Sequence, residues 1–289
     1  MSLLALTLVV IAAFTHATWN LLAKNAASIG APFVAAYTAL ALLLYAPAAL
    51  WALVRFGLPL TPLNIVCILA SGILHLAYSL ILQRGYRVAD LSVVYPVARG
   101  TGPLLSAIGA FLLLGEPVTA GAVLGLLAVV GGILLLASGG RVGLLANPSS
   151  RSGVVWGGAT GGFIAGYTVV DGWGVKALGI NPILLDWCAN TARLAFLAPG
   201  ILRDWQGFRD RMSGFWWLAA GVGVLAPLGY ILVLTALHLG APLHVVAPAR
   251  EMSMMVGVVL GVTVLGERIS GLRLAGCAMI VAGVVLLVL

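Results

Sequence analysis

Long apolar stretches, separated by short polar or Gly- and Pro-containing segments, run through the whole chain. A membrane-spanning helix needs about 20 mainly apolar residues, and about ten of the stretches reach that length. Because lipid offers no hydrogen bonds, each span must satisfy its own backbone as a helix, and the runs do not alternate as strands of a closed barrel would. The predicted spans are 3–22, 32–54, 62–83, 89–114, 119–138, 153–174, 182–202, 214–237, 242–265 and 270–289.

The composition leaves no room for a soluble catalytic domain. Of 289 residues, 62% are hydrophobic and 8% are charged, whereas a soluble domain carries about 25% charged residues. The mean hydropathy is +1.14. The first apolar stretch has no positively charged start and no clear cleavage site before Lys24, so we interpret it as the first span and not as a signal peptide.

An internal repeat divides the chain. The segment that starts at Asp90 aligns without a gap with the segment that starts at Ala241, an offset of 151 residues. Matched positions include Ala98-Arg99 with Ala249-Arg250, Leu114-Gly115-Glu116 with Leu265-Gly266-Glu267, Gly125 with Gly276, Gly132 with Gly283 and, more loosely, Pro32 with Pro182. We therefore predict an all-α polytopic membrane protein of ten transmembrane helices in two five-helix repeats, 1–147 and 148–289. Five is odd, so the halves are inserted in opposite senses, a plan common among secondary transporters with a midplane site between the halves.

The repeated Leu-Gly-Glu triplets, each followed by a Gly-rich helix, and the Trp19-Asn20 pair resemble the drug/metabolite transporter superfamily in its ten-helix EamA-type branch. The resemblance implies alternating access through a central cavity lined by the first four helices of each half. It also implies export of amino acids or related metabolites, as in many bacterial members. Small four-helix relatives couple drug efflux to protons through a Glu in helix one, but this helix one has no acid.

The charge distribution predicts the orientation. The net charge is +7, and most Lys and Arg fall in loops on one side of the predicted bundle. The positive-inside rule places that side in the cytoplasm of a bacterial inner membrane and both termini in the periplasm, and the charge does not indicate a nucleic-acid partner. The basic side carries Lys24, Arg84, Arg87, Arg141, Arg151, Arg203, Arg209, Arg211, Arg268 and Arg273, and the other side Arg55 and Lys176.

Three arginines, Arg99, Arg193 and Arg250, lie inside predicted spans. An Arg at the centre of a span costs about 2.5–3.5 kcal/mol on insertion scales, so it normally faces a partner or a water-filled path. Arg99 and Arg250 occupy equivalent repeat positions and are candidates to bind a substrate carboxylate through bidentate hydrogen bonds. The alternative is internal ion pairs, Arg250 with Glu251 and Arg193 with Asp186.

Prolines and aromatic residues surround these arginines. Pro96, Pro103 and Pro248 remove helical donors and are candidate hinges, or harmless kinks. Mid-span aromatic and polar residues could form a flat-walled pocket suited to a bulky neutral amino acid; alternatively, they pack within the bundle. The full set of candidate substrate-binding residues is Trp19, Asn20, His75, Tyr78, Tyr95, Arg99, Tyr167, Trp187, Tyr230, His244 and Arg250.

His16, His75 and Glu251 are candidate proton carriers, and Glu251 is expected to be the only carboxylate well inside a span. Each His could equally serve as a hydrogen-bonded structural residue, and facilitated diffusion remains an alternative to proton antiport. Glu116 and Glu267 each precede a helix and are expected to be structural, since acids near a helix start complement its dipole.

Motifs for other chemistry are absent. The chain has no phosphate loop and no H-E-x-x-H motif, which excludes a self-contained ATP-driven pump. Cys67, Cys188 and Cys277 form no disulfide framework or metal motif, so we expect no metal and no cofactor. The leading function is a non-enzymatic secondary carrier that meets a small-molecule substrate and the bilayer, as monomer or homodimer. Alternatives are a lipophilic-cation efflux carrier, an intramembrane enzyme and a structural membrane protein.

Overall fold

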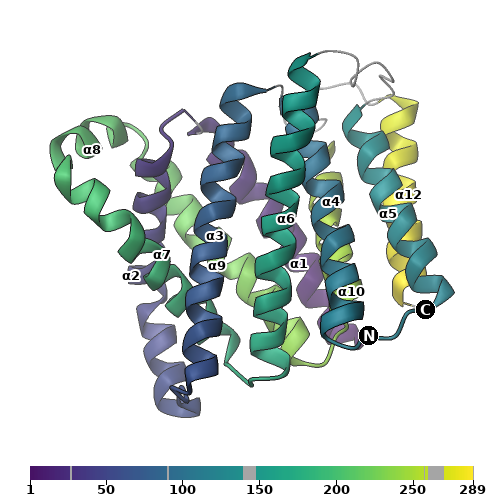
Figure 1. Cartoon of the computed structure of the whole chain (residues 1–289), viewed down its shortest axis with the longest axis horizontal. Helices are drawn as coiled ribbons and strands as arrows, with labels where there is room; N and C mark the ends of the chain where they lie inside the picture. The colour runs from purple at the N-terminus through teal and green to yellow at the C-terminus, as the bar shows by residue number, and fades with distance from the viewer. Residues whose placement is uncertain (27, 90, 139–147, 257, 260–269, 289) are drawn as a thin grey trace.

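The computed structural model describes residues 1–26, 28–89, 91–138, 148–256, 258–259 and 270–288, and this part of the chain is helical throughout, without strands (Figure 1). The helices are α1 (Leu3–Asn25), α2 (Ala31–Phe56), α3 (Pro62–Val88), α4 (Leu91–Leu113), α5 (Ala120–Ser138), α6 (Pro148–Lys176), α7 (Pro182–Arg203), α8 (Trp205–Met212), α9 (Trp216–His238), α10 (Leu243–Ala249), the 3₁₀ turn η1 (Arg250–Met252) and α12 (Gly271–Val288).

The prediction of an all-α polytopic membrane protein is confirmed. Within the described residues, seven helices are long and apolar enough to cross a membrane, and Ala120–Leu136 forms a shorter apolar helix. Helix α7 has 22 residues but is less apolar, because it carries Asp186, Asn190 and Arg193. Large apolar side chains such as Val54, Leu112 and Leu3 stay 77–82% exposed, as expected for helices that face lipid.

Local sequence signals begin several of these helices. The Thr61 hydroxyl accepts the backbone N–H of Asn64 at 3.2 Å, and Pro62 occupies the first helical position of α3. In the second half the Asn181 side chain accepts the N–H of Ile183 at 3.0 Å, and Pro182 begins α7. Both arrangements satisfy a donor that a helix start leaves free, and proline fits there because it has no N–H to satisfy.

Helix α8 was not expected, because the sequence predicts a connection over 203–213. The Asp204 side chain caps α8 by accepting the Gly207 N–H at 3.0 Å. Phe208 and Met212, four residues apart on one face, are buried, while Arg211 pairs with Asp204 at 2.7 Å. A helix of eight residues is too short to give a clear periodic signal in a sequence.

The predicted span 242–265 differs from the structure in its first part. Helix α10 ends at Ala249, the chain passes through the 3₁₀ turn η1, and residues 253–256 are helical again. Pro248 lacks the N–H that would continue the helical ladder, which explains a break near this point. In contrast, α4 remains a continuous α-helix through Pro96 and Pro103.

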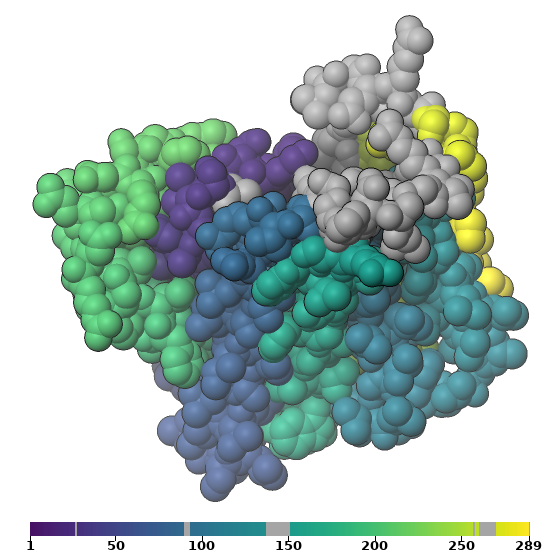
Figure 2. Space-filling view, turned by 45° about the horizontal axis from the view of Figure 1, so that its top comes forward, coloured from purple at the N-terminus to yellow at the C-terminus, as the bar shows by residue number. Residues whose placement is uncertain are grey.

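The described helices pack against one another in five main pairs. The closest packings join α5 with α12, α1 with α9, α3 with α6, α4 with α6, and α2 with α7. The last helix of the first half, α5, and the last helix of the second half, α12, lie together at one edge of the molecule. Helices α7 and α8 lie at the opposite edge (Figures 1 and 2). Helix α1 begins and α12 ends at the same face of the bundle, opposite α8 (Figure 1).

Glycines allow α5 and α12 to approach at backbone distance. A Cβ atom added to Gly125 would lie 2.7 Å from the carbonyl oxygen of Gly283, and one added to Gly132 would lie 2.7 Å from that of Gly276. Because small residues permit such contact between membrane helices, these four positions explain why two otherwise smooth apolar helices adhere.

Candidate substrate cavity

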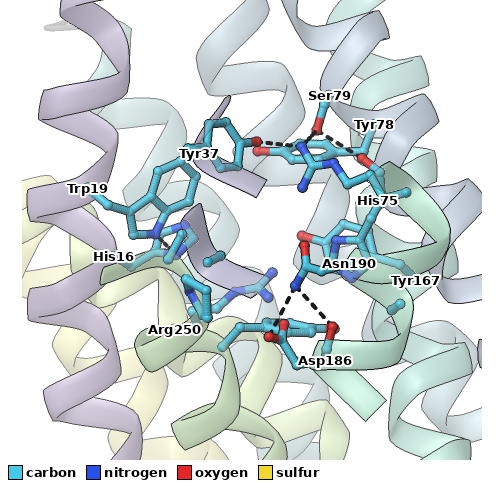
Figure 3. Close-up of a pocket in the computed structure, with 16 residues that line it drawn as sticks. His16, Trp19, Tyr37, His75, Tyr78, Ser79, Tyr167, Asp186, Asn190 and Arg250 are labelled. Atoms are coloured by element: carbon cyan, nitrogen blue, oxygen red, sulfur yellow. Dashed lines mark hydrogen bonds between the residues drawn. The ribbon is translucent and has the colours of Figure 1, made fainter. Parts of the chain in front are cut away.

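A cavity of about 90 Å³ lies among helices of both halves (Figure 3). Side chains from α1, α2, α3, α6, α7, α9 and η1 reach it. The lining residues are His16, Trp19, Tyr37, Ala41, His75, Tyr78, Ser79, Tyr167, Asp186, Ala189, Asn190, Arg193, Ala226, Pro227, Tyr230 and Arg250. The wall therefore combines flat rings with a small number of charged groups, the composition of a small-molecule site.

Aromatic rings from three helices form one continuous wall. His75 of α3 stacks on Tyr167 of α6 with ring centroids 3.9 Å apart. Tyr230 of α9 meets the His75 ring edge-on at 5.1 Å, and Tyr78 meets Tyr167 edge-on at 5.7 Å. Such pairs hold the rings in fixed orientations beyond what burial alone achieves.

Behind this wall lies a carboxylate that the sequence analysis overlooked. Asp171 of α6 is fully buried, and its Oδ2 lies 3.1 Å from His75 Nε2 and accepts the hydroxyl of Tyr230. Asp186 is buried as well. Both residues lie within five positions of a helix end, so the expectation that Glu251 is the only carboxylate well inside a span stays a prediction. Asp171 follows Tyr167 by four residues, so the helical period places the two on one face, and this was the signal available.

The two arginines at equivalent repeat positions have different surroundings. Arg99 donates to Glu251 Oε2 at 3.2 Å, and its second terminal nitrogen lies 2.9 Å from His16 Nε2. Arg250 Nε lies 3.7 Å from Glu251 Oε1, beyond hydrogen-bonding distance, and has no hydrogen-bond partner. The Arg250 side chain points into the cavity (Figure 3). Glu251 thus pairs with the distant Arg99 more closely than with its neighbour in sequence.

His16 stands between two donors. Its Nδ1 accepts the indole N–H of Trp19 at 3.2 Å, while its Nε2 faces Arg99. A neutral imidazole offers one acceptor nitrogen and an imidazolium offers none. The surroundings of His16 therefore favour a neutral ring in this conformation.

Arg193 does not pair with Asp186, contrary to the alternative weighed from the sequence. It donates to the hydroxyl of Tyr37 on α2 and to Ser79 Oγ on α3 at 2.7 Å. The Asp186 carboxylate instead accepts the side-chain amide of Asn190 at 3.1 Å (Figure 3). Arg193 thus ties three helices together at the cavity wall, and Asp186 presents a carboxylate without an ion-pair partner among the described residues.

The cavity brings together Trp19, His75, Tyr78, Tyr167, Tyr230 and Arg250 from the predicted substrate-binding set, and also His16. The other predicted residues do not line it. Asn20 donates to the His16 carbonyl at 2.6 Å, and Trp187 donates to the Leu42 carbonyl at 3.0 Å. The Tyr95 ring lies against the Arg99 guanidinium, with 5.3 Å between the ring centroid and Arg99 Cζ. His244 belongs to a separate cluster.

That cluster surrounds Glu116, in the turn between α4 and α5. Its carboxylate accepts Lys176 Nζ at 2.6 Å, the backbone N–H groups of Leu243 and His244 at 2.7 and 2.9 Å, and contacts the His244 ring at 2.7 Å. Burial raises the pKa of this carboxyl, but these hydrogen bonds outweigh it and lower the pKa to about 2. Glu116 is structural, as expected, but it caps α10 in the other half and not the helix that follows it. Glu267 lies outside the described residues.

Helices of spanning length with a buried, charged cavity between them define a membrane protein of the transporter class. Residues 151–289 match the model of the EamA-like transporter family. The second half of the chain is therefore similar to that family, which confirms the resemblance to the drug/metabolite transporter superfamily and indicates a membrane transporter of small molecules.

Solved structures share the fold of this chain. One, titled "Crystal structure of protein", matches with a TM-score of 0.73 over 98% of this chain and 95% of that chain. Its sequence identity is 18%, so the likeness shows the fold alone. No curated protein sequence matches the chain.

Proposed function

We propose that the protein is a secondary carrier that exports amino acids, or related small metabolites, across the inner membrane by alternating access. The observation that carries this proposal is Arg250, which is 2% exposed, lines the cavity and has a guanidinium Nε without a hydrogen-bond partner. A buried guanidinium is costly when its pairing is incomplete, as it is with Glu251 at 3.7 Å, and a substrate carboxylate matches its two-pronged geometry.

A second charged residue of the cavity supports a zwitterionic substrate. Asp186 has only an amide partner among its hydrogen bonds and lines the same cavity as Arg250 (Figure 3). The rings of His75, Tyr78 and Tyr167 line the same cavity and contact one another. A carboxylate at Arg250, an ammonium group at Asp186 and an apolar side chain against the rings would match the charges of an amino acid with a bulky neutral side chain.

The volume of the cavity restricts the substrate further. Pockets for drug-sized molecules measure about 300–1,000 Å³, and this cavity measures about 90 Å³. We infer that the conformation is nearly closed around a small ligand. Larger cargo would require the halves to move apart.

The helix packing supports two inverted halves, 1–147 and 148–289. If α1, α3 and α5 correspond to α6, α9 and α12, the pairing of α1 with α9 becomes the pairing of α6 with α3, and both are observed. Alternating access would then move one half against the other, with the break at Pro248 and η1 as a hinge beside Arg250. Pro96 and Pro103 lie in a continuous helix, and a hinge role for them would require bending of α4.

The orientation follows from the basic loops. Helix α8, with Arg209 and Arg211, and the start of α6, with Arg151, lie at one face, while α1 begins and α12 ends at the opposite face (Figure 1). By the positive-inside rule the termini are periplasmic. A reporter enzyme fused after Leu289 would show periplasmic activity if this orientation is correct, and cytoplasmic activity would reverse it.

Efflux of lipophilic cations is a second candidate function. Glu251, the acid first considered for it, is paired with Arg99. Asp186 is the carboxylate that lines the cavity, so a cation carrier would use it. If Asp186→Asn abolished efflux of a lipophilic cation such as tetraphenylphosphonium while amino-acid flux were absent throughout, this candidate would replace the first.

The deciding experiment is uptake of radiolabelled phenylalanine, leucine and threonine by liposomes that contain the purified protein. We expect saturable uptake and counterflow. Arg250→Met should raise the KM at least about tenfold, because a buried charge pair is worth about 2–5 kcal/mol. Arg209→Met, which changes an exposed arginine on α8, serves as the matched control and should transport normally. Absence of flux for every amino acid, or an unchanged KM in Arg250→Met, would contradict the proposal. Chemical conversion of the substrate would indicate an enzyme.

A further inference from the structure

Asp171 has one satisfied and one unsatisfied oxygen. Its Oδ2 accepts the hydroxyl of Tyr230 and lies 3.1 Å from His75 Nε2. Its Oδ1 is buried and has no hydrogen-bond partner. A buried acceptor left unpaired destabilises a protein, and more so when it is charged. Inside a membrane such a carboxylate indicates a functional group by default.

A second unsatisfied oxygen lies one helical turn before it. Thr168 Oγ1 is buried and also has no partner, and residues three apart share a helix face. Other threonines in these helices behave differently: Thr160 and Thr235 each donate to the carbonyl four residues earlier at 2.7 Å. The face of α6 near Asp171 therefore holds two oxygens that await a small donor.

The charges around Asp171 do not supply that donor. None of the described Lys or Arg side chains forms an ion pair with it. The titratable groups that interact with it are His75 and Cys67 of α3, Tyr230 of α9, Asp186 of α7 and Tyr167 of its own helix. A proton on Oδ1 would remove the buried negative charge of Asp171. The protonated carboxyl would also become a hydrogen-bond donor, and Thr168 Oγ1 on the same helix face could accept from it.

The other candidate proton carriers are occupied. Glu251 accepts Arg99 at 3.2 Å, and both ring nitrogens of His16 face N–H donors. His75, in contrast, connects the cavity with Asp171, because it lines the cavity and contacts the carboxylate. Tyr230 makes the same connection from α9.

We propose that Asp171 is the coupling site of the carrier and binds one proton per transport cycle. The proton enters from water on one side of the membrane, binds at Oδ1 and leaves to water on the other side, with no other bond made or broken. A substrate that hydrogen-bonds to His75 or Tyr230 competes with Asp171 for these donors, which links the loading of the cavity to the loading of the proton site. This inference rests on the carrier function proposed above.

The test separates exchange from proton-driven accumulation. In liposomes with radiolabelled phenylalanine, leucine or threonine, the normal protein should show counterflow at equal pH and accumulation under a pH gradient. Asp171→Asn should retain counterflow and lose at least about tenfold of the gradient-driven accumulation, because an amide cannot carry the proton. Asp210→Asn, an exposed residue of α8, is the matched control and should show both activities.

The outcomes separate the two proposals. Absence of counterflow in the normal protein would contradict the carrier assignment for these substrates. Normal counterflow with undiminished gradient-driven accumulation in Asp171→Asn would contradict the proton site. Accumulation driven by a sodium gradient and not by pH would also overturn it and assign the site to Na⁺.

A direct titration gives an answer that does not depend on the substrate. In detergent, proton uptake measured with a pH indicator between pH 9 and pH 4 should be one proton lower in Asp171→Asn. If that variant does not fold, Thr168→Val should change the proton-uptake curve, because the protonated carboxyl loses its acceptor. An unchanged titration in the variant that folds would contradict the proposal.

Discussion

The same residue type performs three tasks in this protein. Arg99 neutralises Glu251, Arg193 ties α7 to α2 and α3 through hydroxyl groups, and Arg250 projects into the cavity. Successive residues of the 3₁₀ turn η1 point about 120° apart, so Glu251 reaches Arg99 on α4 although Arg250 precedes it directly in the chain. Charge alone therefore does not tell which arginine is available to a substrate.

The pairing predicts an asymmetry between single and double substitutions. Arg99→Met should leave Glu251 buried without its closest partner and lower the free energy of unfolding by about 3–5 kcal/mol. Replacing both residues, Arg99→Met with Glu251→Met, should recover most of that loss. Unfolding in mixed detergent, followed by Trp fluorescence, measures both effects. A double variant as unstable as the single one would show that the pair is not the source of the stability.

At the same scale, the sequence predicted much of the cavity but not its acids. The mid-span position of His75, Tyr78, Tyr167 and Tyr230 was sufficient to predict that they lie together. Asp171 was overlooked because it lies close to the end of its helix in sequence, where acids usually face water. Its burial depends on His75 and Tyr230, which come from helices distant in the chain, and no local pattern reports such contacts.

At the scale of helices, α5 and α12 are held together by close packing at their glycines. A Cβ on Gly132 would lie 2.7 Å from a backbone carbonyl oxygen of Gly276, which cannot move as a flexible side chain could. We therefore expect Gly132→Ala to lower the free energy of unfolding by about 1–3 kcal/mol. Gly158→Ala is the matched control, since nothing lies within 4 Å of its added Cβ, and alanine there should be neutral or slightly stabilising.

Thermal denaturation in detergent, read by loss of the monodisperse peak in gel filtration, compares the two glycine variants. Equal midpoints would mean that α5 and α12 separate at little cost.

The sequence predicted the existence and type of nearly every long helix, because an apolar run of spanning length is a strong signal. It did not predict the 3₁₀ turn after Pro248. Proline occurs inside both segments, yet α4 stays continuous through Pro96 and Pro103, so a proline alone does not indicate where a helix breaks.

Across the whole molecule, Glu116 fastens the turn after α4 to the start of α10 and the end of α6. Its pKa of about 2 lies below the unfolded value of about 4.3. A lowered folded-state pKa contributes stability that is fully present above the unfolded pKa and is lost as pH falls towards 2. Glu116→Gln should remove this dependence and lower stability at neutral pH by about 1–3 kcal/mol.

Denaturation midpoints of the normal protein and Glu116→Gln between pH 7 and pH 3 measure this prediction. The two curves should approach each other towards pH 3, because the unfolded protein takes up a proton at this carboxyl below about pH 4.3 while the folded protein keeps it charged. Parallel curves would show that other carboxyls dominate the acid response. Exposed Asp210→Asn provides the reference for a carboxyl without such bonds.

The contact of α5 with α12 has a consequence for how such a chain could be assembled. Gly125 and Gly132 align with Gly276 and Gly283 in the repeat, yet Gly125 touches Gly283 and Gly132 touches Gly276. Exchanging the halves maps one contact onto the other, which is the rule for a surface that binds its own copy about a two-fold axis. Two separate five-helix polypeptides would carry the same adhesive face, so cells that express residues 1–147 and 148–289 from two genes should be able to rebuild the carrier without a peptide bond between its halves.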